Sequence, residues 1–152
     1  MARVFRTCKV VILFQFNSRD LRHFAAAQSA ASNSNFRIHV GCVVVYKGNV
    51  IAKGWSSERT DPLQARFNFY KHIEDCNSVI HKQHAEIMAL KKIRFLDIDM
   101  SKVDVYVWRG YKDGSPAMAR PCAACMQMIR TMGIKNVYYS SNGGLAAERL
   151  IG

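Results

Sequence analysis

The sequence predicts a mixed α/β fold. Two observations carry this expectation: apolar runs alternate with amphipathic stretches, and turn residues separate them. The hydrophobic content of 49% is ordinary for a globular protein. The candidate elements follow the order helix, strand, strand, helix, strand, helix, strand. A chain of 152 residues matches the common domain size. We therefore expect a single domain over residues 1–152, with residues 1–17 as an N-terminal extension.

The amino-terminal part predicts a short apolar element and then a helix. Basic residues precede the apolar run VVILF at 10–14, as in a signal peptide, but the run is too short and leads into polar residues. We expect an extra strand there, or an extension of the first helix. That helix is predicted over about residues 19–31, with Asn17 or Ser18 as its N-cap.

Residues 37–55 predict a β-hairpin. Two apolar runs are joined at residues 47–49, whose sequence Lys-Gly-Asn is typical of a tight turn. The first run is apolar on both faces, as expected of a central strand between helices. Further strands are predicted at 103–108 and 133–140, and a short terminal helix at 145–151.

Two motifs supply metal ligands. The tripeptide HAE at 84–86 and the pentapeptide PCAAC at 121–125 each open a predicted helix, and 34 residues separate them. His84, Cys122 and Cys125 offer an imidazole and two thiolates, and three protein ligands leave the fourth zinc position open, as in catalytic sites. The cysteines are three apart, so a helix with the motif's proline in its first turn places both sulfurs on one face. Its N-terminus stabilises thiolates.

Glu86 is predicted to carry protons. It lies two residues after His84, so it points beside the ligand rather than along the same helical row, and it is poorly placed as a fourth ligand. Zinc lowers the pKa of bound water to about 7, and a nearby carboxylate can accept that proton and return it. The pattern indicates one catalytic Zn²⁺ per chain. A closed structural site would need His81 or Cys76 as its fourth ligand.

The order H-x-E then P-C-x-x-C is the signature of zinc nucleobase deaminases. The chain resembles the cytidine deaminase-like superfamily over about residues 18–150. The resemblance implies a three-layer α/β/α sandwich with a central mixed sheet of about five strands and the two ligand-bearing helices adjacent on one side. It implies His84, Cys122 and Cys125 as zinc ligands and Glu86 as proton shuttle. The implied reaction is hydrolytic loss of an amino group from a base.

The resemblance also points to substrate contacts. Many relatives carry an asparagine after the aromatic residue that closes the second strand, whereas Ser56 follows Trp55 here. Either Ser56 takes over that contact or the base is held differently. The backbone near Ala85 and Cys122 is a further candidate contact.

The loop at 109–120 belongs beside the active-site mouth in the topology that the resemblance implies. Its cationic and aromatic side chains are candidates for gripping a phosphate and stacking a flanking base. They are Arg109, Tyr111, Lys112 and Arg120.

The charge bears on the substrate. Lysine and arginine number 22 against 11 acidic residues, which gives a net charge of +11. The surplus lies in segments 1–60 and 109–152, while segment 61–108 is neutral. A polynucleotide favours such a balance through counterion release, although a basic surface that only aids solubility would look the same.

Our main hypothesis is therefore a zinc-dependent cytosine deaminase that acts on polynucleotide, with single-stranded DNA favoured over RNA. The sequence CAAC followed by Met126-Gln127 favours the pyrimidine branch. The first alternative is a free cytidine or dCMP deaminase, and the next is a tRNA adenosine deaminase. Outside the enzymes, the chain would be a catalytically silent relative that binds nucleic acid, against which the intact Glu86 and ligand set argue.

The insert before His84 leaves two choices open. Aromatic and basic residues interleave at 66–72, which suits base stacking, but Phe67 and Tyr70 also suit the buried edge of an amphipathic helix. Three residues are candidates for a second, structural zinc, although we expect them to be ordinary loop or helix residues: His72, Cys76 and His81.

Cysteine usage and hydropathy suggest the compartment. Cys42 lies in an apolar strand and is expected to be a small buried hydrophobe. Five cysteines with no disulfide pattern favour a reducing cytoplasm. No apolar stretch reaches 18 residues, so we expect no membrane span.

Overall fold

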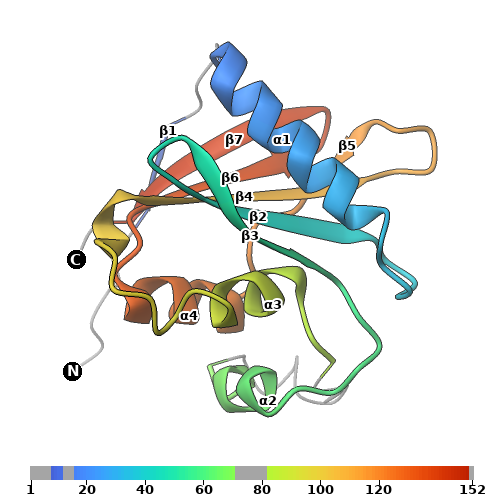
Figure 1. Ribbon diagram of the computed structural model, residues 1–152. Coiled ribbons are helices and arrows are strands. Elements are labelled where there is room, and N and C mark those ends of the chain that lie inside the picture. The colour runs from blue at the N-terminus through green and yellow to red at the C-terminus, as the bar shows by residue number, and fades with distance from the viewer. Residues whose placement is uncertain (1–7, 12–15, 71–81, 151–152) are drawn as a thin grey trace.

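The computed structural model describes the backbone of residues 8–11 and the complete residues 16–70 and 82–150. The expected α/β fold and its three layers are confirmed (Figure 1). Helix α1 (Ser18–Ala31) covers one face of a mixed sheet, and helices α3 (Ala85–Lys91) and α4 (Ala123–Met132) lie adjacent on the other.

The sheet has the strand order β1-β7-β6-β4-β2-β3, and β5 pairs with β4. Strands β4 and β6 are parallel, and the other pairs are antiparallel. Five strands, β7, β6, β4, β2 and β3, form the centre of the sheet, which agrees with the expected number. Strand β1 and the two-residue β5 add to this sheet. The bounds are β1 Cys8–Val11, β2 Val40–Tyr46, β3 Asn49–Trp55, β4 Val103–Gly110, β5 Pro116–Ala117, β6 Asn136–Ser141 and β7 Gly144–Leu150.

The helix predicted at 145–151 is wrong, because Gly144–Leu150 forms strand β7. It pairs with β6 from Ser141↔Gly144 onward and with β1 along its other edge. The two-residue connection is Asn142-Gly143, with Gly143 at φ 77°. Asn-Gly between two strands is a strong hairpin signal. Pairing on both edges therefore outweighs the helix preference of Leu, Ala and Glu.

Helix α1 begins where the sequence predicts. The Asn17 side chain accepts a hydrogen bond from the Asp20 N–H at 2.8 Å, and the Asp20 carboxylate accepts one from the Asn17 N–H. This capping box fixes the helix start. The short segment Cys8–Val11 is the extra strand, not an extension of α1.

Two glycines let the helices approach the sheet. A Cβ at Gly41 would lie 1.9 Å from the Ala27 carbonyl oxygen of α1, and one at Gly54 would lie 2.2 Å from the Ala85 carbonyl oxygen of α3. Each helix thus packs directly on strand backbone. The contact at Gly54 brings the start of α3, and with it the HAE motif, against β3.

The apolar core lies on both faces of the sheet. The larger part fills the space between the sheet and helices α3 and α4, and the smaller part lies under α1 around Phe24 and Tyr106. Cys42 is fully buried in β2, as expected.

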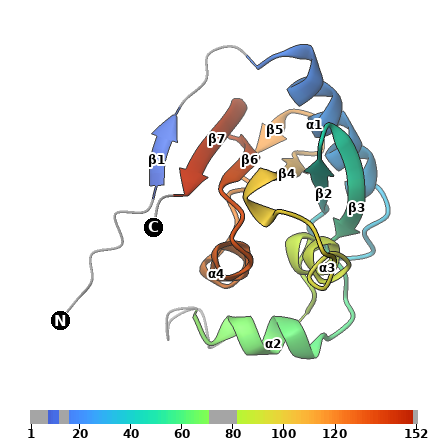
Figure 2. The same cartoon turned by 60° about the vertical axis from the view of Figure 1, so that its left-hand side comes forward.

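Helix α2 (Pro62–Asn68) lies beyond α3 and α4, away from the sheet (Figure 2). Phe67 packs against the larger core, whereas Tyr70 is 49% exposed, so the expected buried edge holds for Phe67 alone. The second-zinc candidates His72, Cys76 and His81 lie outside the described residues. No helix in the described part of the chain is long and apolar enough to cross a membrane.

Candidate active site

The starts of two neighbouring helices carry the three predicted zinc ligands. His84 is the N-cap residue of α3 and Cys122 that of α4, and Cys125 lies in the first turn of α4. Neither N-cap side chain makes a capping hydrogen bond, so both are available to a metal. Pro121 precedes the N-cap, so its predicted place in the first turn is wrong.

The ligand atoms have the spacing of a tetrahedral zinc site. His84 Nδ1 lies 3.5 Å from Cys122 Sγ and 3.3 Å from Cys125 Sγ. Ordinary Zn–N and Zn–S bonds at a tetrahedral angle would separate such atoms by about 3.6 Å. The residues therefore fit zinc. Among the described residues, this is the one group of three or more His, Cys, Asp or Glu with such geometry.

The pKa values of the two thiols shift in opposite directions. The hydrogen bond from Cys125, with the neighbouring His84, lowers the pKa of Cys122 to about 3, although burial opposes this shift. Burial raises the pKa of Cys125 well above its usual value. Both sulfurs bind a metal as thiolates, so metal binding works against the raised pKa of Cys125 and releases its proton.

Glu86 lies in the first turn of α3 and is only 5% exposed. Burial raises the pKa of its carboxyl group, and the nearby His84 partly offsets that shift. A carboxyl group whose pKa moves toward neutrality can both hold and release a proton. This is the property that a proton carrier beside the zinc site requires.

A cavity of about 410 Å³ opens over His84, Cys122 and Glu86. Binding pockets for small ligands start at about 300 Å³, so the space suits one nucleoside or nucleotide. Its wall contains four of the predicted contact residues, Ser56, Ala85, Arg109 and Arg120. It also contains Phe36, Ile38, Val40, Gln83, Met118 and Ala119.

Tyr111 and Lys112 do not reach this cavity. They line a neighbouring hollow of about 520 Å³, which shares Arg37, Ile38 and Arg109 with the wall of the first. The Tyr111 hydroxyl donates a hydrogen bond to Asn142 Oδ1 at 3.0 Å. The loop at 109–120 therefore reaches the active-site cavity through its ends and not through its middle.

Ser56 is occupied by the protein itself. Its hydroxyl donates to the Ile38 carbonyl at 2.6 Å and accepts from the Val40 N–H at 3.0 Å. Ser34 Oγ lies 2.7 Å from the same oxygen. Ser56 thus holds the segment before β2 in place and shapes the cavity wall.

Arg120 pairs with a carboxylate. Its Nε donates to Glu148 Oε1 at 2.7 Å and a terminal nitrogen donates to Oε2 at 3.2 Å. Glu148 is buried in β7 and also accepts the Tyr139 hydroxyl at 2.7 Å. This bidentate pair fixes the guanidinium group beside the cavity.

Two cations in the wall were missed by sequence reasoning, Arg37 and Lys82. Lys82 lies two residues before His84, and this proximity was an available signal. Arg37 lies in the segment before β2, which only the folded chain brings to the cavity. Within the described residues, neither Arg37 nor Arg109 forms an ion pair, so both can meet an anionic ligand.

Sequence comparison identifies a family. The profile described as "Cytidine and deoxycytidylate deaminase zinc-binding region" matches residues 17–141. No curated protein matches the chain.

Solved structures share the fold. The dCMP deaminase of the cyanophage S-TIM5 is 24% identical, with a TM-score of 0.55 over 82% of this chain and 84% of that one. It has also been solved in complex with dCMP and dUMP. The cytidine deaminase of Burkholderia pseudomallei is 17% identical, with a TM-score of 0.59 over 85% and 91% of the two chains. The guanine deaminase of Bacillus subtilis is 18% identical, with a TM-score of 0.51 over 84% and 66%.

Proposed function

We propose that this chain, which belongs to the cytidine and deoxycytidylate deaminase zinc-binding family, converts the cytosine of a free nucleotide, dCMP, to uracil. The family is one of zinc-dependent deaminases, so the reaction class follows from membership. The family's description and the named dCMP and cytidine deaminases favour a free substrate over the polynucleotide of our main hypothesis. The observation that carries the proposal is a nucleotide-sized cavity with cations in its wall above the zinc ligands.

The chain's own groups account for the proton transfers. Zinc, when held by His84, Cys122 and Cys125, supplies an activated water for addition to the ring carbon that bears the amino group. Glu86 accepts the proton that this water gives up and delivers it to the neighbouring ring nitrogen. The hydroxyl group now on that carbon gives up its remaining proton, which passes through Glu86 to the amino group; this group leaves as ammonia while the carbonyl forms. Water and cytosine are consumed, and uracil and ammonia are formed.

Arg37, Lys82 and Arg109 supply the charge for the phosphate of dCMP. All three lie in the wall of the cavity that contains Glu86. One monophosphate carries up to two negative charges, so two or three cations suffice to bind it. A nucleoside without phosphate gains nothing from them, and this is our reason to place dCMP ahead of cytidine.

A direct test compares substrates on the zinc-loaded protein. Cytidine, dCMP, single-stranded DNA and RNA are offered separately, and uracil products are quantified. We expect the highest kcat/KM with dCMP. Arg37→Ala should raise KM for dCMP about tenfold and leave cytidine turnover unchanged, since it removes a phosphate contact. Turnover of cytidine at the same kcat/KM as dCMP would contradict the phosphate assignment.

Single-stranded polynucleotide is the second candidate. The hollow beside the cavity favours it, because Lys112, Tyr111 and Trp108 lie there next to the shared Arg37 and Arg109. Cations and aromatic rings in one groove suit a flanking nucleotide. Salt separates the two candidates. Turnover of a polymer should fall steeply between 50 and 200 mM salt (roughly 10³-fold for a multi-phosphate contact), whereas turnover of dCMP should change little.

A further inference from the structure

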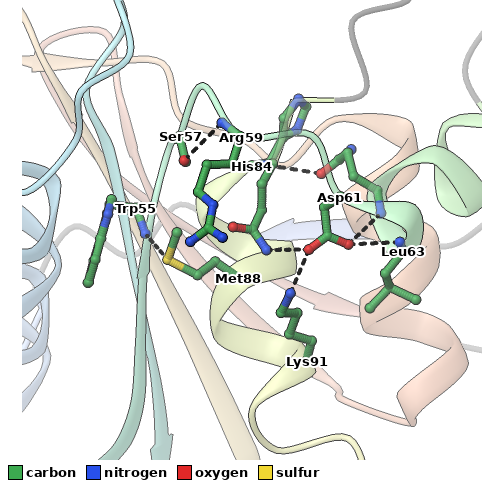
Figure 3. A network of polar contacts seen from close by, with 10 residues as sticks. Trp55, Ser57, Arg59, Asp61, Leu63, His84, Met88 and Lys91 are labelled. Carbon is green, nitrogen blue, oxygen red and sulfur yellow. Dashed lines mark hydrogen bonds and ion pairs between the residues drawn. The ribbon is translucent and has the colours of Figure 1, made fainter.

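The segment around α2 makes polar contacts with the residues just before the zinc-binding helix (Figure 3). Asp61 is the N-cap of α2, and its Oδ1 accepts the Leu63 N–H at 2.8 Å and the Gln64 N–H at 3.4 Å. Its Oδ2 accepts hydrogen bonds from Gln83 Nε2 and Lys91 Nζ, each at 2.6 Å. One buried carboxylate thus joins the start of α2, the residue before His84 and the end of α3.

Gln64 contacts His84 directly. Its Oε1 accepts the His84 backbone N–H at 3.0 Å, and its Nε2 donates to Asn68 Oδ1 at 2.8 Å. The Gln64 side chain is completely buried. A buried carboxamide with both ends bonded has a single orientation, because breaking either bond leaves a polar group unpaired in the interior.

The backbone on both sides of His84 is therefore held. Before it, the Gln83 backbone N–H donates to the Arg59 carbonyl at 2.9 Å, and the Gln83 carbonyl accepts the Ser57 N–H at 3.0 Å. After it, the His84 carbonyl accepts the Met88 N–H at 3.1 Å in the first turn of α3. The imidazole makes no capping hydrogen bond that would orient it from its own helix.

We propose that Gln64, supported by Asp61, is a positioning residue for the zinc site. Gln64 holds the His84 backbone so that the imidazole Nδ1 faces the two cysteine sulfurs. Neither residue is a metal ligand, and α2 lies outside the layers that form the sheet sandwich. Outer partners of metal ligands commonly affect metal affinity about 10- to 100-fold. The proposal concerns the zinc site and is independent of which cytosine substrate is used.

The decisive variant is Gln64→Met, which keeps the side-chain volume and removes the acceptor for the His84 N–H. We expect its dissociation constant for zinc, measured by competition with a chelating indicator, to rise about 10- to 100-fold. Gln64→Glu still offers an oxygen to the His84 N–H but loses the donor to Asn68, so it should bind zinc more tightly than Gln64→Met and more weakly than wild type. All measurements belong at a temperature where each metal-free variant is folded, as checked by circular dichroism.

Leu63→Ala is the matched control. Leu63 lies on the same helix and packs against the core, and its side chain has no acceptor to offer the His84 N–H. The variant should lower the melting temperature and leave the zinc dissociation constant unchanged. If Leu63→Ala weakens zinc binding as much as Gln64→Met, the helix has only a structural role and the proposal is wrong. An unchanged zinc affinity in Gln64→Met would also overturn it.

A second variant and its control test the supporting role of Asp61. They also keep the proposal testable if Gln64→Met does not fold. Asp61→Asn keeps an N-cap side chain for α2 but weakens the bond to Gln83, and we expect zinc affinity to fall a few-fold. Lys92→Met removes the neighbouring lysine, whose Nζ donates to the Lys53 carbonyl at the surface and not to Asp61, and it should not change zinc affinity. Equal zinc affinities for wild type and Asp61→Asn would exclude Asp61 from the positioning role.

Discussion

His84 and Glu86 lie two residues apart but have different environments, and this difference divides their roles. His84 is outside the helical backbone of α3 and turns Nδ1 toward the thiols. Glu86 is inside the first turn, where burial raises its pKa. A single helix start therefore presents a zinc ligand and the proposed proton carrier to the same cavity.

Glu86→Gln should separate proton transfer from metal binding. The amide keeps the shape of the side chain but cannot carry the proton, so we expect kcat to fall about 10²- to 10⁴-fold. Metal analysis should still find one zinc per chain. The control is Glu58→Gln, an exposed acidic position that is not part of the cavity wall, which should not change kcat. Retention of activity in Glu86→Gln would remove the residue from its proposed role.

Among the elements, helices α1 and α3 pack on opposite faces of the β2–β3 hairpin through glycines. Neither contact leaves room for a Cβ at its glycine. Of these two helices, only α3 contributes residues to the active site. The helices therefore provide a matched pair of positions, one on the catalytic face and one on the other.

Gly54→Ala and Gly41→Ala should both destabilise the protein and differ in activity. Overpacking of this kind costs about 1–3 kcal/mol or more, measured as the free energy of unfolding in urea. Gly54→Ala must shift α3, and with it His84 and Glu86, so kcat should fall as well. Gly41→Ala should keep its activity per folded molecule. Equal kcat for the two variants would contradict the prediction that the Gly54 contact, and not the Gly41 contact, positions the active-site residues.

Helix α1 also contains an acid-sensitive position. His23 is 3% exposed, its ring lies 5.1 Å from that of Tyr106, and its Nε2 has no hydrogen-bond partner among the described residues. Burial, followed by the charges of Arg22 and Arg19, lowers its pKa below 6.5, although Asp20 and Asp104 oppose the shift.

The unfolded chain binds a proton at His23 more readily than the folded chain does. The contribution of the neutral His23 to the free energy of unfolding is therefore present above pH 6.5 and is lost as the pH falls below that value. The urea midpoint should therefore drop between pH 7 and pH 5. In His23→Phe this drop should be smaller, since the phenyl ring takes up no proton. An identical pH dependence in the variant would exclude His23 as its source.

At the scale of the whole molecule, zinc connects two helices that start from distant parts of the sequence. His84 belongs to α3 and both cysteines belong to α4, and the ligand atoms lie within 4.8 Å of one another. Metal binding therefore stabilises the packing of one complete layer on the sheet.

Removal of zinc should lower the melting temperature. A ligand at 1,000 times its dissociation constant contributes about 4 kcal/mol of stability if it binds only the folded state. We expect a chelator to lower the melting temperature by several degrees, and re-addition of zinc to restore it, as followed by calorimetry. A Cys125→Ser variant should show a much smaller zinc response. The same response in that variant would contradict the assigned ligand set.

Several features of the fold and site could be predicted from the sequence because their signals are local. The capping residue Asn17, the Lys-Gly-Asn turn at 47–49 and the β-branched runs each act within a few residues. The ligand types were equally evident, since imidazole and thiolate chemistry does not depend on the path of the chain between them. These signals indicated the elements and the zinc site, and the resemblance to the cytidine deaminase-like superfamily added the layers and the class of reaction.

Other features depend on contacts between distant segments. Residues 145–151 prefer a helix locally, but two neighbouring strands recruit 144–150 into the sheet. Arg120 stays a predicted substrate contact, but only the fold shows that Glu148 lies beside it and pairs with its guanidinium group. Ser56 stays a predicted substrate contact, but only the fold shows that its hydroxyl bonds the Ile38 carbonyl and the Val40 N–H.

The sequence by itself determined which groups are available for the chemistry, because two short motifs contain the three zinc ligands and Glu86, the proposed proton carrier. Only the tertiary structure decided what surrounds them. Gln64 meets His84 across 20 residues of sequence, and Arg37 meets the cavity from the segment before β2. The physical reason is that side-chain type is a local property, whereas burial, pairing and the direction of a hydrogen bond arise only when distant segments pack together.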